Sequence, residues 1–218
     1  MSDLVLMGDP RVAAIPVREC GDELIDTRVD GVLASTPDVN PGNSTYAYLR
    51  RSVAERLVQA QDALPDGLGF LISEGYRPHD QQEFYFNRRK QLVRELDPSL
   101  TEDGAHLKAS EYISPPDIAP HVSGGAIDMT LIDASGTQLD LGTAIDATPE
   151  STDNACYFAA ENISAEARAN RAIMAAALTH AGLVNYPTEW WHWSYGDRYW
   201  ALMTGEAYAL FGPVRGVE

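Results

Sequence analysis

Two histidines stand beside carboxylates at spacings that suit a metal ion. His121 opens the segment His121-Val-Ser-Gly-Gly-Ala-Ile-Asp128, and His192 follows Glu189 by three positions. The glycine pair lets the backbone turn tightly between His121 and Asp128. Imidazole nitrogen and carboxylate oxygen are ligands that Zn²⁺ accepts. Each pattern alone also fits a surface histidine with a solvated aspartate, or a histidine satisfied inside an aromatic core.

The segment Glu189-Trp-Trp-His192-Trp193 surrounds the second histidine with bulky rings. A separation of three places Glu189 and His192 on one side of a helical turn or irregular loop, but on opposite faces of a regular strand. The tryptophans can exclude water and fix neighbouring side chains. If His192 joins His121 and Asp128 on one zinc ion, the fourth position stays open for water, which is typical of a catalytic site.

Arg77 ends the segment Ser73-Glu-Gly-Tyr-Arg77 and precedes Pro78. A residue before proline favours an extended backbone, so Arg77 can project from a strand end. Its charge could stabilise a developing oxyanion. The alternative is a surface arginine paired with one of the many carboxylates.

Together the three segments resemble the signature of the zinc D-alanyl-D-alanine dipeptidases of the VanX type, within the wider group of zinc D,D-peptidases. That family shows, in this order, a Tyr-Arg-Pro element, a His-x6-Asp element and a Glu-x-x-His element. Here they stand at 76–78, 121–128 and 189–192, and the resemblance covers most of residues 40–200.

The resemblance implies a role for each matched position. It implies one Zn²⁺ held by His121, Asp128 and His192, with Glu189 as general base and Arg77 as the group that stabilises the tetrahedral intermediate. It also implies a substrate-binding set around the pocket: Asp146, which would hold the substrate's free amino group, Tyr76 and Ser123.

One departure concerns that amino group. In the family pattern two serines precede the first zinc histidine, whereas Ala119 and Pro120 stand here. The sequence therefore does not determine which groups bind the amino group of the substrate, nor which dipeptide is preferred.

The elements that must position these residues are read from periodicity and turn signals. Helices are predicted over 45–64, 78–96, 101–110 and 164–180, and strands over 68–73 and 126–131. Residues 137–141 are predicted to pair back as a hairpin, 183–195 to form strands and turns, and 143–163 to form a long loop. Residues 12–17 read as extended, inside an N-terminal loop region, 1–43, that packs as an arm on a catalytic core, 44–218. We expect one compact α+β domain with helices packed on a mostly antiparallel sheet.

The charge balance restricts the partners. Among 218 residues, 16 are basic and 32 acidic, giving a formal charge of −16. Nucleic-acid binding needs a basic footprint and is not expected. No run approaches 18 apolar residues, so no membrane insertion is expected either. The expected partner is a small D,D-dipeptide, and the sequence leaves the oligomeric state open.

Cys20 and Cys156 lie far apart and show no metal-binding spacing. Two free buried thiols are expected, with a single disulfide as the alternative. The N-terminus lacks a positive region followed by a long apolar run, so a cytoplasmic location is expected.

The resemblance implies a zinc metallopeptidase that hydrolyses D-Ala-D-Ala or a similar dipeptide. One alternative is a D,D-carboxypeptidase that acts on longer cell-wall peptides. Another is a relative that binds such peptides, with or without zinc, and has lost catalysis.

Overall fold

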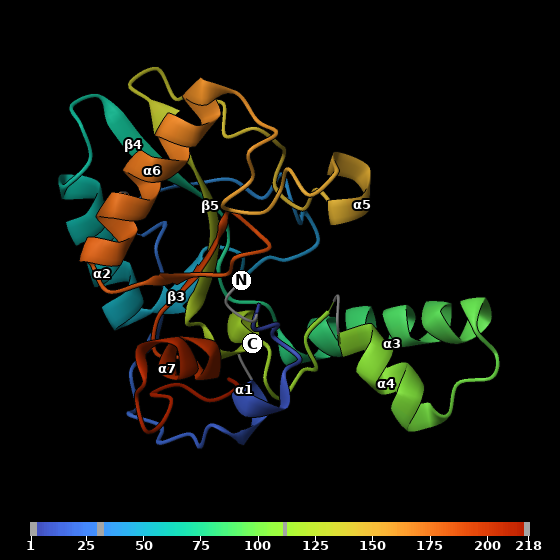
Figure 1. Cartoon of the computed structure of the whole chain (residues 1–218). Helices are drawn as coiled ribbons and strands as arrows, with labels where there is room; N and C mark the ends of the chain where they lie inside the picture. The colour runs from blue at the N-terminus through green and yellow to red at the C-terminus, as the bar shows by residue number, and fades with distance from the viewer. Residues whose placement is uncertain (1–3, 30–32, 111–112, 216–218) are drawn as a thin grey trace.

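The computed structural model describes residues 4–29, 33–110 and 113–215 (Figure 1). Its helices are α1 (Pro10–Ala14), α2 (Arg51–Asp62), α3 (His79–Leu96), α4 (Glu102–Ser110), the 3-10 helix η1 (Pro120–Ser123), α5 (Pro149–Thr152), α6 (Ala165–His180) and α7 (Arg198–Thr204). Its strands are β1 (Leu24–Asp26), β2 (Ala34–Ser35), β3 (Tyr48–Arg50), β4 (Leu68–Glu74), β5 (Ala126–Asp133), β6 (Val184–Asn185) and β7 (His192–Ser194). Among the described residues, no helix is long and apolar enough to cross a membrane.

The central sheet has five strands in the order β2-β4-β5-β7-β6. Only the β2–β4 pair is parallel, and the other pairs of this sheet are antiparallel. β1 and β3 form a separate antiparallel pair. The prediction of an α+β fold with a mostly antiparallel sheet is therefore confirmed.

The two faces of the central strand β5 have different surroundings. Ile127, Met129 and Leu131 are fully buried in the main hydrophobic core, which also contains apolar side chains of α2 and α6. These two helices contact each other and lie side by side in Figure 1. Because successive strand residues alternate in direction, Asp128 points away from that core. The paired helices α3 and α4 project away from the sheet (Figure 1).

Most predicted elements form, with three corrections. The first long helix begins at Arg51 and not at residue 45, because residues 48–50 pair with 24–26 as β3 and β1. Residues 12–17 are not a continuous extended stretch. Helix α1 forms instead because Asp9 caps it, accepting a hydrogen bond from the backbone of Arg11 at 2.8 Å, and because Pro10 suits a first helical turn.

The third correction concerns residues 137–141. They pair back only through an isolated bridge between Ile132 and Gln138. Helix α7 was not predicted, although Asp197 caps it through a hydrogen bond to the Trp200 backbone at 2.6 Å. The division of the chain at residue 43 stays a prediction.

Both cysteines are free, as expected. Cys156 is buried, but Cys20 is exposed, so the expectation that both are buried was wrong for Cys20.

Candidate metal centre

Two carboxylate side chains and one imidazole side chain form one row across the central sheet. The strand register pairs Asp128 with Glu74 of β4 on one side and with His192 of β7 on the other. Directly opposed residues on neighbouring strands present their side chains to the same face. A register shift between Ile72 and Glu74 interrupts the alternation of β4 just before this row. The row therefore lies on the face of β5 opposite the apolar core.

His121 reaches this row from the turn that precedes β5. Pro120 begins the short helix η1, and Gly124 ends it with a φ of 72°, a conformation that favours glycine. The His121 Nδ1–H donates to the carbonyl oxygen of Gly75 at 2.7 Å, because a carbonyl can only accept. This bond fixes the ring and leaves its Nε2 lone pair facing Asp128 and His192.

The predicted ligand atoms of His121, Asp128 and His192 lie within 4.8 Å of one another. His121 Nε2 is 3.2 Å from His192 Nδ1 and 3.4 Å from Asp128 Oδ2, and His192 Nδ1 is 3.0 Å from Asp128 Oδ1. Tetrahedral ligands at roughly 2.1 Å from zinc stand about 3.4 Å apart. The donor types and their separations therefore fit zinc with little rearrangement.

The electrostatics of the cluster favour a cation between these groups. Burial alone disfavours the charged form of Asp128, but the two imidazoles outweigh it and hold the pKa of Asp128 well below its usual range. Burial alone lowers the pKa of His121, yet the charge of Asp128 raises it overall. An anion held among ring nitrogens therefore stabilises positive charge at this position.

Glu189 stands beside the cluster without belonging to it. Its Oε2 is 3.9 Å from His192 Nδ1, and it lines the pocket that opens onto the metal ligands. The turn before β7 places it there: the His192 N–H donates to the Glu189 carbonyl at 3.2 Å. Burial, followed by the negative charges of Asp128 and Asp146, raises the pKa of Glu189 to about 7, against the opposing effect of His192. A carboxyl that titrates near neutrality suits a general base.

Arg77 also lines the pocket, and Glu74 holds it there. Its guanidinium donates Nε–H to Glu74 Oε1 at 3.1 Å and a second N–H to Oε2. Burial opposes the charge of Arg77, but Glu74 raises the pKa of Arg77 above its usual range. Arg77 is thus a fixed cation on the pocket wall; its role toward an oxyanion stays a prediction.

Asp146 enters the pocket from the loop that follows β5. Its φ is 62°, a left-handed conformation that is rare for residues other than glycine. Where such conformations do occur, they cluster at functional sites. The residue is exposed to solvent, but the surrounding protein and the charges of Asp128 and Glu74 raise the pKa of Asp146 to about 6.

A buried arginine of α6 secures this loop. Arg171 donates hydrogen bonds to the backbone carbonyls of Leu141, Ala155 and Tyr157 at 2.7–2.8 Å. Several loop residues line the pocket, namely Asp146, Ala147, Thr148, Pro149, Glu150, Asp153, Asn154 and Tyr157. The long loop predicted over 143–163 therefore shapes the pocket, with only α5 as regular structure inside it.

Two residues predicted to bind substrate lie outside the pocket lining. Tyr76 is buried, and its hydroxyl donates to the carbonyl of Val214 at 3.3 Å. The Ser123 hydroxyl donates to the carbonyl of Pro120 at 2.6 Å and accepts from the backbone of Gly125 at 3.1 Å. Both side chains support the backbone around the cluster.

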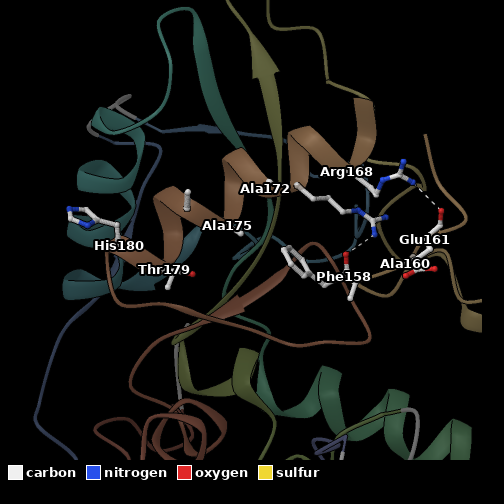
Figure 2. A pocket seen from close by; sticks show the side chains of 11 residues that line it. Phe158, Ala160, Glu161, Arg168, Ala172, Ala175, Thr179 and His180 are labelled. Carbon is white, nitrogen blue, oxygen red and sulfur yellow. Dashed lines mark hydrogen bonds between the residues drawn. The ribbon is translucent and has the colours of Figure 1, made fainter. Parts of the chain in front are cut away.

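The pocket over the cluster has a volume of about 1030 Å³. A separate hollow of about 760 Å³ lies between α6 and residues 158–161 (Figure 2). Its wall is largely alanine, with Ala172 and Ala175 along α6, and it lacks the convergent carboxylates and imidazoles of the first pocket. The chemistry therefore points to the pocket over the cluster.

The sequence analysis missed Glu74 and the residues before α1. Glu74 was detectable by its position three residues before Arg77, at the end of a predicted strand. Leu4, Leu6 and Met7 line the pocket as well, and no local pattern in the sequence places them there.

Comparison with known proteins finds one matching family and several relatives. The family described as D-ala-D-ala dipeptidase (Peptidase_M15) matches residues 29–208. A D-alanyl-D-alanine dipeptidase of Synechocystis sp. is 29% identical over 220 residues, covering 86% of this chain and 87% of the relative. A D-alanyl-D-alanine dipeptidase of Enterococcus faecium is 28% identical over 152 residues, covering 66% and 71%. The solved structure of VanYB in complex with D-Ala-D-Ala aligns with a TM-score of 0.47 and 15% identity, covering 91% of this chain and 94% of that one.

Proposed function

Because the chain belongs to the Peptidase_M15 family of D-Ala-D-Ala dipeptidases, we propose that it hydrolyses D-Ala-D-Ala or a similar small D,D-dipeptide at the cluster of His121, Asp128 and His192. The observation that carries the proposal is the position of Glu189. A carboxylate with a pKa of about 7 stands 3.9 Å from a ligand nitrogen, inside the pocket that leads to the cluster.

One ion held by His121, Asp128 and His192 would be zinc. When bound, zinc supplies a Lewis acid that polarises the scissile carbonyl and makes water a stronger nucleophile near neutral pH.

The chain's own groups would carry the proton and the charge. Glu189 accepts a proton from the attacking water and then delivers it to the leaving amine. Arg77, already fixed by Glu74, faces the negative charge that develops on the carbonyl oxygen. The carboxylate of Asp146 pairs with the free ammonium group of the dipeptide. Ala119 lines the pocket without a side-chain hydrogen-bond acceptor, so Asp146 carries more of this recognition.

One observation favours a second candidate, a D,D-carboxypeptidase for longer peptides. The pocket volume of about 1030 Å³ reaches the upper end of the range of ligand pockets, roughly 300–1,000 Å³, and exceeds what a dipeptide fills. An open pocket could admit residues that precede the scissile pair.

Release of free D-Ala from D-Ala-D-Ala tests the proposal. We expect hydrolysis by zinc-loaded protein and loss of hydrolysis after chelation, with recovery on adding zinc back. Zinc-loaded protein that binds one equivalent of metal but releases no D-Ala would contradict the proposed reaction.

A further inference from the structure

Residues 4–8, here called the 4–8 segment, form a wall of the catalytic pocket. Leu4, Leu6 and Met7 are among the side chains that line it. The segment precedes residue 29, where the family match begins, so the family resemblance gives no expectation for it. Charged groups of the same pocket come from other elements, among them Glu74, Arg77, Asp128, Asp146 and Glu189. The 4–8 segment therefore adds apolar surface to a pocket that also contains these charged groups.

The segment is anchored on the metal-ligand side of the pocket. The Met7 N–H donates to the Tyr186 hydroxyl at 3.2 Å, and the Tyr199 hydroxyl donates to the Val5 carbonyl at 3.4 Å. The Tyr186 ring in turn meets the ring of His192 edge to face, with centroids 5.9 Å apart. The backbone of the segment is thus tied to a ring that packs on a predicted ligand.

Packing fixes the other side of the segment. Met7 is buried in a small core with Val12, Tyr186 and Tyr199. A side chain at Gly8 would place its Cβ 2.6 Å from the Ser110 carbonyl oxygen at the end of α4, which is closer than real contacts allow. The segment therefore lies directly against α4 and cannot shift toward it.

Leu4 and Leu6 differ from these anchors in exposure. Leu4 is 46% exposed and Leu6 is half-buried, and both line the pocket. Apolar side chains left accessible in a pocket are available to contact a ligand.

We propose that the 4–8 segment determines specificity: Leu4 and Leu6 contact the apolar side chain of the bound dipeptide and limit its size, while Met7 and Gly8 hold them in place. This inference rests on the proposed dipeptidase function, and it adds which side chains select among dipeptides.

The test compares kcat/KM for D-Ala-D-Ala, D-Ala-D-Leu and D-Leu-D-Ala in the zinc-loaded full chain. One methylene in an apolar pocket changes discrimination by roughly 10–200-fold. We expect Leu6→Ala, alone and with Leu4→Ala, to raise the ratio for one leucine-containing dipeptide over D-Ala-D-Ala at least ~10-fold, and Leu6→Phe to lower it. Leu96→Ala, on an exposed leucine at the end of α3, is the matched control and should leave the ratio unchanged.

A binding measurement separates selection from general damage. The Leu4 and Leu6 substitutions are repeated in a Glu189→Ala background, and affinities for the same dipeptides are measured by calorimetry. The affinities should rank the dipeptides in the same order as kcat/KM does, and the zinc content should be unchanged. If the Leu4 and Leu6 substitutions change kcat/KM for all three dipeptides by the same factor, the specificity role is wrong, while the dipeptidase function stands. If wild-type protein hydrolyses none of the three, the proposed function fails first and the inference with it.

Discussion

Glu74 binds one edge of the Arg77 guanidinium with both of its carboxylate oxygens: Nε donates to Oε1 at 3.1 Å and a second N–H donates to Oε2. The carboxylate is almost fully buried, and Asn40 and Asn43 also donate to Oε1, at 2.8 and 3.0 Å. Glu74 is also the cross-strand neighbour of the predicted ligand Asp128. Arg77, the proposed oxyanion-stabilising group, and the candidate metal ligand Asp128 are therefore both positioned by the same row of the sheet.

Glu74→Gln tests this positioning. Breaking a buried ion pair by removing one partner costs about 3–5 kcal/mol, because the remaining charge is left uncompensated. We expect a loss of this size in the free energy of unfolding, measured by urea denaturation, and a fall in kcat. Glu23→Gln is the control, because Glu23 pairs with Arg51 at the exposed surface, where such pairs contribute little. Equal effects of the two substitutions would contradict the role of Glu74.

Arg77→Ala should reduce kcat by about 10²–10³-fold, the usual effect of removing one oxyanion donor. Arg77→Lys should restore only part of this, because lysine cannot pair with both oxygens of Glu74. The role is wrong if kcat/KM for Arg77→Ala stays within about threefold of wild type.

If Glu189 is the proposed general base and not a ligand, Glu189→Ala should keep zinc and lose at least ~10²-fold in kcat. Metal content by atomic absorption, measured beside kcat, distinguishes the two roles. Glu166→Ala, on an exposed residue of α6, is the control. Loss of metal together with activity would make Glu189 a ligand or a structural residue.

Zinc should stabilise the fold through His121. A ligand at 100 times its Kd adds about 2.7 kcal/mol to the free energy of unfolding. We therefore expect zinc to raise the Tm of wild type and of His180→Ala, whose histidine is exposed on α6, but not of His121→Ala. A zinc-dependent Tm shift that survives in His121→Ala would remove His121 from the ligand set.

If Asp146 binds the ammonium group of the substrate, KM for D-Ala-D-Ala should depend on pH. The pKa of Asp146 is raised to about 6, so the carboxylate is charged above this value and neutral below it. Pairing with a substrate ammonium group is thus present well above pH 6, is half lost near pH 6 and disappears as the pH falls further. We expect KM for D-Ala-D-Ala to rise over that interval in wild type. In Asp146→Asn, KM should be high throughout and lack this dependence, so a wild-type pH profile in this variant would contradict the role.

Local sequence patterns were sufficient for the elements around the site. The strand over 126–131 follows from its alternation, and α6 follows from helical spacing after its Ser164 cap. The convergence of His121, Asp128 and His192 also follows from their motifs once the family resemblance is included.

Long-range pairing accounts for most of what the sequence did not indicate. The helical pattern of 45–64 extends through residues 48–50, but these residues pair with β1, more than twenty positions earlier. The contact of the 4–8 segment with Tyr186 spans 179 positions in the chain. Such contacts depend on the tertiary arrangement. The position of Glu74 opposite Asp128 likewise follows from the strand register, although its spacing from Arg77 was visible in the sequence.

The most direct test of the central claim is kcat/KM for D-Ala-D-Ala beside N-acetyl-D-Ala-D-Ala, measured with the zinc-loaded protein. A carboxylate beside an ammonium group favours its charged form, so a pocket with Asp146 in its wall should recognise the free amine. We predict that the free dipeptide is preferred at least ~10-fold, which corresponds to about 1.4 kcal/mol. Equal values, or a preference for the acetylated peptide, would contradict the dipeptidase assignment and favour a D,D-carboxypeptidase.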